Sequence, residues 1–314
     1  MRLVFLGSPP AAVPSLRALV AAGHDVVLVV SGPDKRRGRG GERTPTPVKA
    51  AALELGLDVS DRLEDVAEAG AELGVVVAYG RIIPVSLLDV VPMVNLHFSL
   101  LPRWRGAAPV ERAILAGDER TGVCVMDVAE GLDTGDVHAV EVVDIAPGAT
   151  AADLTVELAS VGADLLVATL ADGLADGRPQ SDRGVTYAHK LSTEDRHLDW
   201  SRSAEELWRV VRIGGAWTTF RGERFKVVDA VPTDGPGDGT PGSIGAGSIT
   251  AGSIVDGSVV CGDGRALRLV TVQPQGRPAM DAASWANGAR ADGERLGEGA
   301  SAGGDVADGS ADRG

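Results

Sequence analysis

The residues best suited to chemistry lie in one stretch, from position 95 to 109. It reads Asn-Leu-His-Phe-Ser-Leu-Leu-Pro-Arg-Trp-Arg-Gly-Ala-Ala-Pro and follows a short apolar run. Because side chains alternate along a strand, Asn95 and His97 would point together from a strand end. An amide donor beside an imidazole can stabilise a developing oxyanion and move a proton. The alternative is structural, with His97 satisfying a backbone carbonyl at a strand-to-loop transition.

A second polar loop follows the next apolar strand. Residues 122–128 read as that strand, and they lead into Ala-Glu-Gly-Leu-Asp-Thr-Gly-Asp at 129–136. The spacing does not match the calcium-binding loop of an EF-hand, whose glycine and closing glutamate fall elsewhere. A plain turn remains the alternative interpretation of this acidic loop.

The elements around these loops predict an α/β domain with a doubly wound sheet. Residues 3–7 and 26–30 are apolar strands, separated by apolar residues at helical spacing. A strand, a helix and a parallel strand form the βαβ unit of such a sheet. The first turn, Gly7-Ser8-Pro9-Pro10, lacks the glycines of a dinucleotide site, and its prolines have no N–H for a pyrophosphate.

Composition narrows the class of protein. Length alone, at 314 residues, favours two domains. Cys124 and Cys261 are too far apart in sequence for a disulfide framework, and no histidine has a partner at zinc-ligand spacing, so we expect no metal and a reducing cytoplasm. No segment has the length of a signal peptide or a membrane span, so we expect a soluble protein. We also expect a monomer.

A basic loop stands out in this acidic chain, whose net charge is −14. The loop, residues 31–47, is rich in glycine and carries five basic side chains: Lys35, Arg36, Arg37, Arg39 and Arg43. Such a basic loop could contact a phosphate backbone. The alternative is a solvated loop with incidental charge, but long loops in compact domains are usually functional.

The pattern changes after about residue 180. A helical pattern at 203–211 is followed by short strands at regular spacing, which suggests a small barrel. We therefore divide the chain into a catalytic domain (1–180), a linker (181–202), a C-terminal barrel (203–286) and a tail (287–314). Glycine-serine-isoleucine repeats connect strands within the barrel, and the tail composition predicts disorder.

These motifs resemble the formyltransferases that use 10-formyltetrahydrofolate. The resemblance rests on Asn-x-His with Ser-Leu-Leu-Pro, and on Gly-Leu-Asp-Thr-Gly-Asp from Gly131. It runs nearly end to end and implies a Rossmann-like catalytic domain followed by an OB-like barrel. Arg-Trp-Arg-Gly-Ala-Ala-Pro, the basic loop and Asp199-Trp200 resemble the members that formylate the α-amine of methionyl-initiator-tRNA.

The resemblance also implies roles for individual residues. Asn95, His97 and Asp133 would be the catalytic trio, in which Asn95 and His97 donate to the oxyanion. Asp133 would orient His97, favour its charged form and relay the proton of the attacking amine. Four residues would line the folate site: Ser99, Leu100, Leu101 and Pro102. The basic loop, Lys35 to Arg43, would enter the acceptor end of the tRNA, and the barrel would bind its body.

Three features depart from the family pattern. Phe98 follows the catalytic histidine where a smaller residue is usual, residues 212–217 are shorter than the corresponding family segment, and the repeats and tail look like additions. One rival function is formyl transfer to an amino sugar, which needs neither the basic loop nor the barrel. The other is a non-catalytic folate- or tRNA-binding protein, which would not need Asn95, His97 and Asp133.

Overall fold

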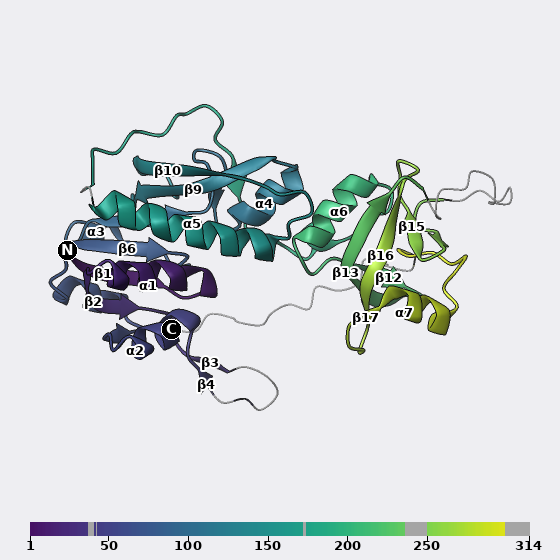
Figure 1. Ribbon diagram of the computed structural model, residues 1–314, viewed down its shortest axis with the longest axis horizontal. Coiled ribbons are helices and arrows are strands. Elements are labelled where there is room, and N and C mark those ends of the chain that lie inside the picture. The colour runs from purple at the N-terminus through teal and green to yellow at the C-terminus, as the bar shows by residue number, and fades with distance from the viewer. Residues whose placement is uncertain (37–40, 42, 172–173, 236–249, 299–314) are drawn as a thin grey trace, which may run out of the picture. The chain divides into compact units, whose positions relative to one another are not determined.

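The computed structural model describes residues 1–36, 41, 43–171, 174–235 and 250–298, and the chain forms two compact units (Figure 1). Unit 1 is Met1–Leu191 and unit 2 is Ser192–Gly314. Unit 1 is an α/β unit with a mostly parallel sheet, and unit 2 has an antiparallel sheet. This architecture confirms the fold class expected from the sequence.

Unit 1 is built on a seven-stranded sheet of order β10-β9-β7-β6-β1-β2-β5. Five strands are parallel: β1 (Arg2–Gly7), β2 (Asp25–Val30), β5 (Val59–Ser60), β6 (Leu73–Val77) and β7 (Met93–His97). The last two, β9 (Arg120–Asp127) and β10 (Val137–Asp144), form an antiparallel pair beside β7. The strands β1 and β6 are buried along almost their whole length, as expected when helices cover both faces of a sheet.

The helical segments of unit 1 connect these strands. They are η1 (Pro10–Ala12), α1 (Val13–Ala21), α2 (Pro47–Glu54), η2 (Leu63–Glu68), α3 (Val85–Leu88), α4 (Pro109–Ala116) and α5 (Ala151–Ala171). Proline opens α2 and α4, where its missing N–H costs no helical hydrogen bond. Two short strand pairs complete the unit: β3 (Lys35–Arg36) with β4 (Arg43–Thr44), and β8 (Arg105–Gly106) with β11 (Tyr187–Ala188).

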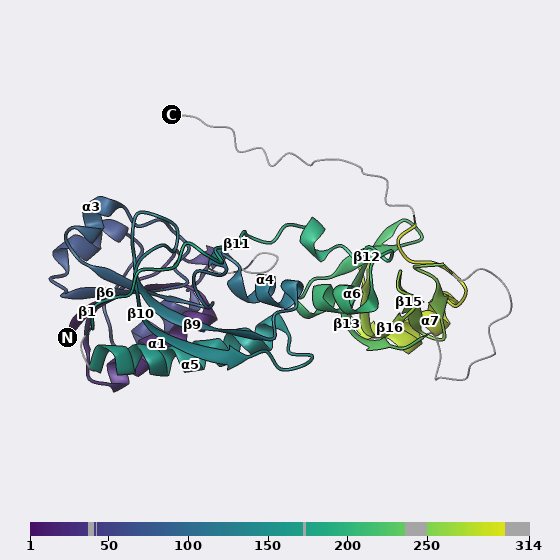
Figure 2. The same cartoon turned by 90° about the horizontal axis from the view of Figure 1, so that it is seen from above.

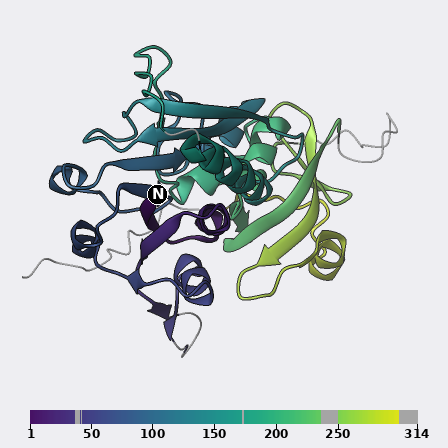
Figure 3. The same cartoon turned by 60° about the vertical axis from the view of Figure 1, so that its left-hand side comes forward.

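Helix α5 corrects one expectation about membrane spans. Its 21 residues make it, among the described helices, the one long and apolar enough to cross a membrane by length and composition. It packs against β9 and β10 (Figure 2). It also lies beside α1, and Figure 3 shows α1 nearly end on. Leu154, Leu158 and Leu166 are fully or almost fully buried along its length. The apolar composition of α5 is therefore that of a helix packed on the core of unit 1.

Unit 2 contains an antiparallel sheet of order β12-β13-β16-β15-β14, with β17 paired to β16. Its elements are η3 (Glu194–Arg196), α6 (Ala204–Arg212), β12 (Trp217–Phe220), β13 (Glu223–Thr233), β14 (Ile254–Val255), β15 (Ser258–Val260), β16 (Ala266–Pro274), β17 (Met280–Asp281) and α7 (Ala282–Ala289). Helix α6 begins with a capping box, and the hydrogen bond from the Ser203 hydroxyl lowers the pKa of Glu206 to about 2.

The segment 293–298 closes this sheet into a barrel. On one side it exchanges backbone hydrogen bonds with β14, since Ile254 N donates to Glu294 O and Gly293 N donates to Ile254 O, both across about 2.8–2.9 Å. On the other side Gly297 N donates to Thr219 O of β12 at 2.9 Å. The side chain of Leu296 is 2% exposed. The two edge strands of the sheet are thus joined through this segment, in agreement with the expected barrel.

Two domain boundaries differ from those expected. Disorder was predicted from residue 287, but α7 continues to Ala289 and the chain then forms the closing segment. Residues 299–314 of the expected tail, and the repeats at 242–249, lie outside the described residues. The first half of the expected linker 181–202 belongs to unit 1, because β11 pairs with β8. Backbone pairing explains both differences, since composition does not reveal it.

Candidate active site

Strand β7 presents Asn95 and His97 on the same face of the sheet, as their spacing predicts. Leu96, between them, packs toward α5, where a methyl group added at Gly162 would lie 2.8 Å from its side chain. The side chain of His97 is 6% exposed, and Asn95 is half-buried. Within the described part of the chain, the Asn95 amide has no hydrogen-bond partner. Its N–H groups are therefore available to a bound molecule.

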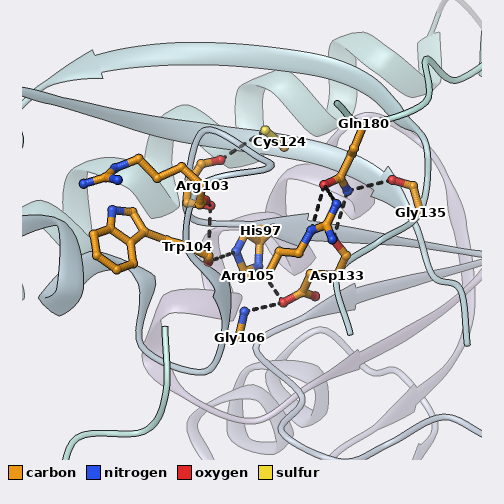
Figure 4. Close-up of polar contacts among 10 residues, drawn as sticks. His97, Arg103, Trp104, Arg105, Gly106, Cys124, Asp133, Gly135 and Gln180 are labelled. Carbon is orange, nitrogen blue, oxygen red and sulfur yellow. Dashed lines mark hydrogen bonds and ion pairs between the residues drawn. The ribbon is translucent and has the colours of Figure 1, made fainter. Parts of the chain in front are cut away.

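The two ring nitrogens of His97 have different neighbours (Figure 4). Nε2 lies 2.9 Å from the carbonyl oxygen of Trp104, and Nδ1 lies 3.6 Å from Oδ2 of Asp133. Because a carbonyl can only accept, Nε2 must donate the hydrogen bond and carry a proton. Nδ1 is then the nitrogen that can gain or lose a proton. The purely structural alternative for His97 accounts for one ring nitrogen and leaves the other facing a carboxylate.

The carboxylate of Asp133 is oriented by the backbone. The amide N–H of Gly106 donates to Oδ2 at 2.7 Å, whereas Oδ1 has no partner among the described residues. The side chain is 15% exposed. Asp133 has a φ of +50°, in the left-handed region that few non-glycine residues adopt. One oxygen is thus fixed beside His97 and the other is available to a ligand.

The loop carrying Asp133 crosses the sheet to reach His97. Asp127, at the end of β9, pairs with Val94 near the start of β7, because the two strands are antiparallel. The loop must therefore double back along β7 before β10 begins. His138 of β10 donates a hydrogen bond from Nε2 to Oδ1 of Asp127 at 2.9 Å. Burial lowers the pKa of His138, but the hydrogen bonds to Asp127 and the Ala175 carbonyl outweigh this effect and raise it. The same pair fixes the base of the loop.

Comparison with known proteins assigns the chain to a family. A family model described as "Formyl transferase" matches residues 1–170, and one described as "Formyl transferase, C-terminal domain" matches residues 190–290. The chain belongs to the formyl transferase family. This assignment confirms the family and the enzyme class that the sequence motifs indicated.

Relatives and solved structures agree with the assignment. The chain is 45% identical over 319 residues to the methionyl-tRNA formyltransferase of Streptomyces coelicolor, covering 95% of this chain and 100% of that one. It is 45% identical over 307 residues to that of Symbiobacterium thermophilum, covering 92% of each. The structure of an N-formyltransferase from Helicobacter canadensis, in complex with folinic acid and dTDP-3-aminofucose, superposes with a TM-score of 0.66. At 18% identity, covering 87% of this chain and 98% of that one, it shows a shared fold.

In this formyl transferase the turn after β7 is stabilised from inside. Ser99 is fully buried, and its hydroxyl donates to the carbonyl oxygen of Arg103 at 2.6 Å. The Cys124 thiol donates to the Ser99 carbonyl at 3.1 Å, and burial raises its pKa to about 11. Leu100, Leu101 and Pro102 are half-buried. The Ser99 hydroxyl therefore stabilises the turn that contains all four residues expected to line the folate site.

Arg103 and Trp104 share one acidic partner that the sequence did not indicate. The Arg103 guanidinium donates to both oxygens of Asp118, at 2.9 and 2.7 Å, and the Trp104 indole donates to Asp118 at 2.8 Å. The guanidinium also lies over the indole ring, 4.3 Å from its centre. Trp104 has a φ of +65°. This cluster fixes the backbone that places the Trp104 carbonyl against His97. The role of Asp118 in it becomes visible only in the folded structure.

The expected basic loop is described in part. Lys35 and Arg36 pair with Arg43 and Thr44 as the hairpin β3–β4, which projects from unit 1 below α2 in Figure 1. Arg37 and Arg39 lie outside the described residues. Arg43 is exposed. The described residues contain no cluster of three or more acidic, histidine or cysteine side chains suited to a metal.

Proposed function

We propose that this formyl transferase moves the formyl group of 10-formyltetrahydrofolate to the α-amine of methionyl-initiator-tRNA. The observation that carries the proposal is the convergence of Asn95, His97 and Asp133 in one unit of the chain. The full-length similarity to relatives named methionyl-tRNA formyltransferase supports the choice of acceptor. Initiator methionyl-tRNA would thereby be prepared for translation.

The proposed reaction makes one bond and breaks one. The amine nitrogen attacks the formyl carbon, the carbonyl oxygen becomes an oxyanion, and the bond from that carbon to the folate N10 then breaks. One proton passes from the amine to N10. The free amide N–H groups of Asn95 would donate to the oxyanion, and so would Nδ1–H of protonated His97. Oδ1 of Asp133 would accept the amine proton, directly or through a water molecule.

The geometry changes how the trio divides its work. The sequence suggested that Asp133 orients His97, but the Trp104 carbonyl already fixes the ring through Nε2. The contact between Nδ1 and Asp133, at 3.6 Å, is longer than a hydrogen bond. In the proposed mechanism Nδ1–H can therefore donate to a substrate oxygen without giving up a hydrogen bond to Asp133.

The proposed folate site lies on the turn after β7. Leu100, Leu101 and Pro102 would contact the pterin, with Ser99 fixing the turn from inside. A folate-derived donor is supported by the shared fold with the Helicobacter canadensis enzyme, whose structure contains folinic acid. No step of this reaction requires a metal ion, because the oxyanion and the proton both have protein partners.

We also propose that the hairpin β3–β4 and the loop at its tip contact the acceptor end of the tRNA. Phosphates attract clustered basic side chains, and here Lys35, Arg36, Arg37, Arg39 and Arg43 are concentrated within nine residues of an acidic chain. The net charge of −14 would repel tRNA elsewhere. Binding would then be confined to the basic parts of the surface.

Charge reversal tests this contact. Replacing Arg36, Arg37 and Arg39 with glutamate is expected to raise KM for methionyl-tRNA about tenfold or more at 0.15 M salt, because phosphate contacts are lost. The KM for the folate donor should not change. The matched control reverses three exposed arginines of unit 1, Arg17, Arg62 and Arg183, and should change KM for tRNA less than about threefold. If both sets of charge reversals raised KM for tRNA equally, the basic loop would have no specific contact with tRNA and its charge would be incidental.

The acceptor itself is tested with two substrates. An amino-sugar nucleotide is the specific alternative, since the Helicobacter canadensis enzyme of the same fold was captured with dTDP-3-aminofucose. The purified chain is expected to transfer radiolabelled formyl from 10-formyltetrahydrofolate to charged initiator tRNA and not to the sugar amine. Transfer to the sugar alone would replace the proposed acceptor. No transfer to either, with folate still bound, would favour a non-catalytic binding protein.

A further inference from the structure

We propose that Gln180 is a positioning residue for Asp133, and that Arg105 acts through Gln180. The inference rests on the proposed function, because it assigns to Gln180 the task of placing a carboxylate that acts in catalysis. Gln180 comes from the segment 178–188, which follows α5 and precedes unit 2. Figure 4 shows its amide between the Asp133 loop and the Arg105 side chain.

The amide of Gln180 spans the backbone of the catalytic loop. Its Nε2 donates to the carbonyl oxygens of Asp133 and Gly135, at 2.9 and 2.8 Å. An amide nitrogen has two hydrogens, so both are used on this loop. The carbonyl groups on either side of Thr134 are thereby fixed to one point. Rotation of the loop about that point would carry the Asp133 carboxylate away from His97 and from the Gly106 N–H.

Arg105 determines which way the Gln180 amide faces. Its Nε and Nη2 both donate to Oε1 of Gln180, at 3.1 and 2.7 Å. The reversed amide would set Oε1 against two carbonyl oxygens and its NH₂ against a guanidinium, so only one orientation satisfies every group. All donors and acceptors of the Gln180 side chain are occupied. Arg105 also precedes Gly106, whose N–H binds the same carboxylate, so the two supports of Asp133 are adjacent in the chain.

The Asp133 loop needs support from outside. Asp133 itself has a left-handed φ of +50°, which is unfavourable for a residue with a Cβ. At Gly135 the backbone passes so close to Asp127 that a methyl group would lie 2.0 Å from its carbonyl oxygen. A loop with this geometry keeps its shape only when neighbouring groups restrain it. The Gln180 amide is the side chain that restrains both Asp133 and Gly135.

The segment that carries Gln180 is attached independently of that amide. Arg178 and Val137 exchange two backbone hydrogen bonds of 2.9 Å each. Toward its other end, Thr186 Oγ1 accepts from Trp104 N at 2.9 Å, and β11 pairs with β8. Removal of the Gln180 amide should therefore leave the segment in place. A loss of activity in such a variant would report on the Asp133 loop and not on unfolding.

The test compares variants of full-length enzyme in formyl transfer to methionyl-initiator-tRNA. Gln180→Leu is expected to lower kcat about 10- to 100-fold, the scale of a catalytic group displaced by about 1 Å, with both KM values within about threefold of wild type. Gln180→Glu keeps the acceptor for Arg105 but lacks the two donors, so it should be equally slow. Arg105→Leu should also be slow, and the Arg105→Leu Gln180→Leu double variant should be no slower than the slower single variant.

The control is Arg178→Leu, two residues away on the same segment and exposed, which should keep wild-type kcat and thermal stability. The inference would be overturned if Gln180→Leu kept the wild-type kcat, or if Gln180→Glu were fully active. Additive losses in the double variant would separate Arg105 from Gln180 and overturn that part. Asp133→Asn distinguishes the two proposals. If Asp133→Asn is fully active, the proposed role of Asp133 is wrong. If Asp133→Asn is inactive while the Gln180 variants are fully active, only the proposed role of Gln180 is wrong.

Discussion

Replacing His97 with alanine is expected to lower kcat for formyl transfer by about 100- to 1,000-fold. The expected loss is that of one oxyanion donor, worth about 10²–10³ in rate. In the proposed mechanism that donor is Nδ1–H of the ring. Steady-state kinetics with saturating folate donor and methionyl-tRNA measure the loss directly.

The fold should survive this replacement. The His97 side chain makes one hydrogen bond, from Nε2 to the Trp104 carbonyl. Losing it leaves that carbonyl with the longer hydrogen bond from the Ser99 hydroxyl, at 3.5 Å, and costs about 1–3 kcal/mol. For a unit of this size we expect Tm to fall by about 2–12 °C. His97→Gln is the matched variant, since its amide can restore the hydrogen bond to Trp104 but provides no second donor at the position of Nδ1. It should recover much of the lost stability while remaining as slow as His97→Ala.

A control histidine distinguishes the site from a general effect. His24 precedes β2, and its ring makes no hydrogen bond to another described residue. His24→Ala should therefore leave kcat unchanged. If His97→Ala retained wild-type turnover, the ring would be structural, as its bond to Trp104 alone would suggest. If His97→Gln were as active as wild type, orientation of the turn would matter and the donor at Nδ1 would not.

The shared face of Asn95 and His97 on β7 could be predicted because it depends on local periodicity. Asn95 and His97 are two residues apart on a strand, and that spacing alone places them together. Asp133 lies 36 residues later and became a candidate only through resemblance to a family. Its route back along β7 follows from the antiparallel pairing of β9, which no pattern in the sequence specified.

The groups that orient the trio could not be predicted for a different reason. His97 is fixed by a carbonyl of Trp104, and Asp133 by an amide of Gly106. Every residue offers such backbone groups, so residue type carries no information about which ones are used. Gln180 is similarly hidden, because its partners lie 45 and 47 residues away and its segment has no regular period. Phe98, by contrast, is accounted for as a buried core residue beside His97.

Composition misled the prediction for residues 287–298. The chain there contains three glycines and five charged residues, a composition that disordered segments often have. Its order comes from backbone hydrogen bonds to β14 and β12 and from two buried apolar side chains, Ala291 and Leu296. A barrel-closing strand can be this poor in apolar residues, because the edges that it joins supply the pairing.

Replacing Leu296 with alanine is therefore expected to lower the free energy of unfolding of unit 2 by about 2–5 kcal/mol, as for other fully buried leucines. The effect can be followed by tryptophan fluorescence during urea unfolding. Four of the five tryptophans belong to unit 2: Trp200, Trp208, Trp217 and Trp285. Trp200 lies against the closing segment, since a methyl group added at Gly297 would be 3.1 Å from its ring.

Two truncations separate pairing from side-chain burial. A chain that ends at Asp292 lacks every backbone hydrogen bond between residues 293–298 and the strands β12 and β14, so both edges of the sheet become unpaired. It should lose more stability than Leu296→Ala and should aggregate through those edges. A chain that ends at Glu298 keeps all the described contacts and should unfold like the full-length protein.

The exposed residue Val228 of β13 provides the matched substitution, and Val228→Ala should cost less than about 1 kcal/mol. If the chain ending at Asp292 unfolded at the same urea concentration as the full-length protein, the barrel would not depend on residues 293–298. Loss of unit 2 should also raise KM for methionyl-tRNA while leaving KM for the folate donor unchanged. That difference would follow because the three residues proposed to act in catalysis, and the groups that hold them, all belong to unit 1.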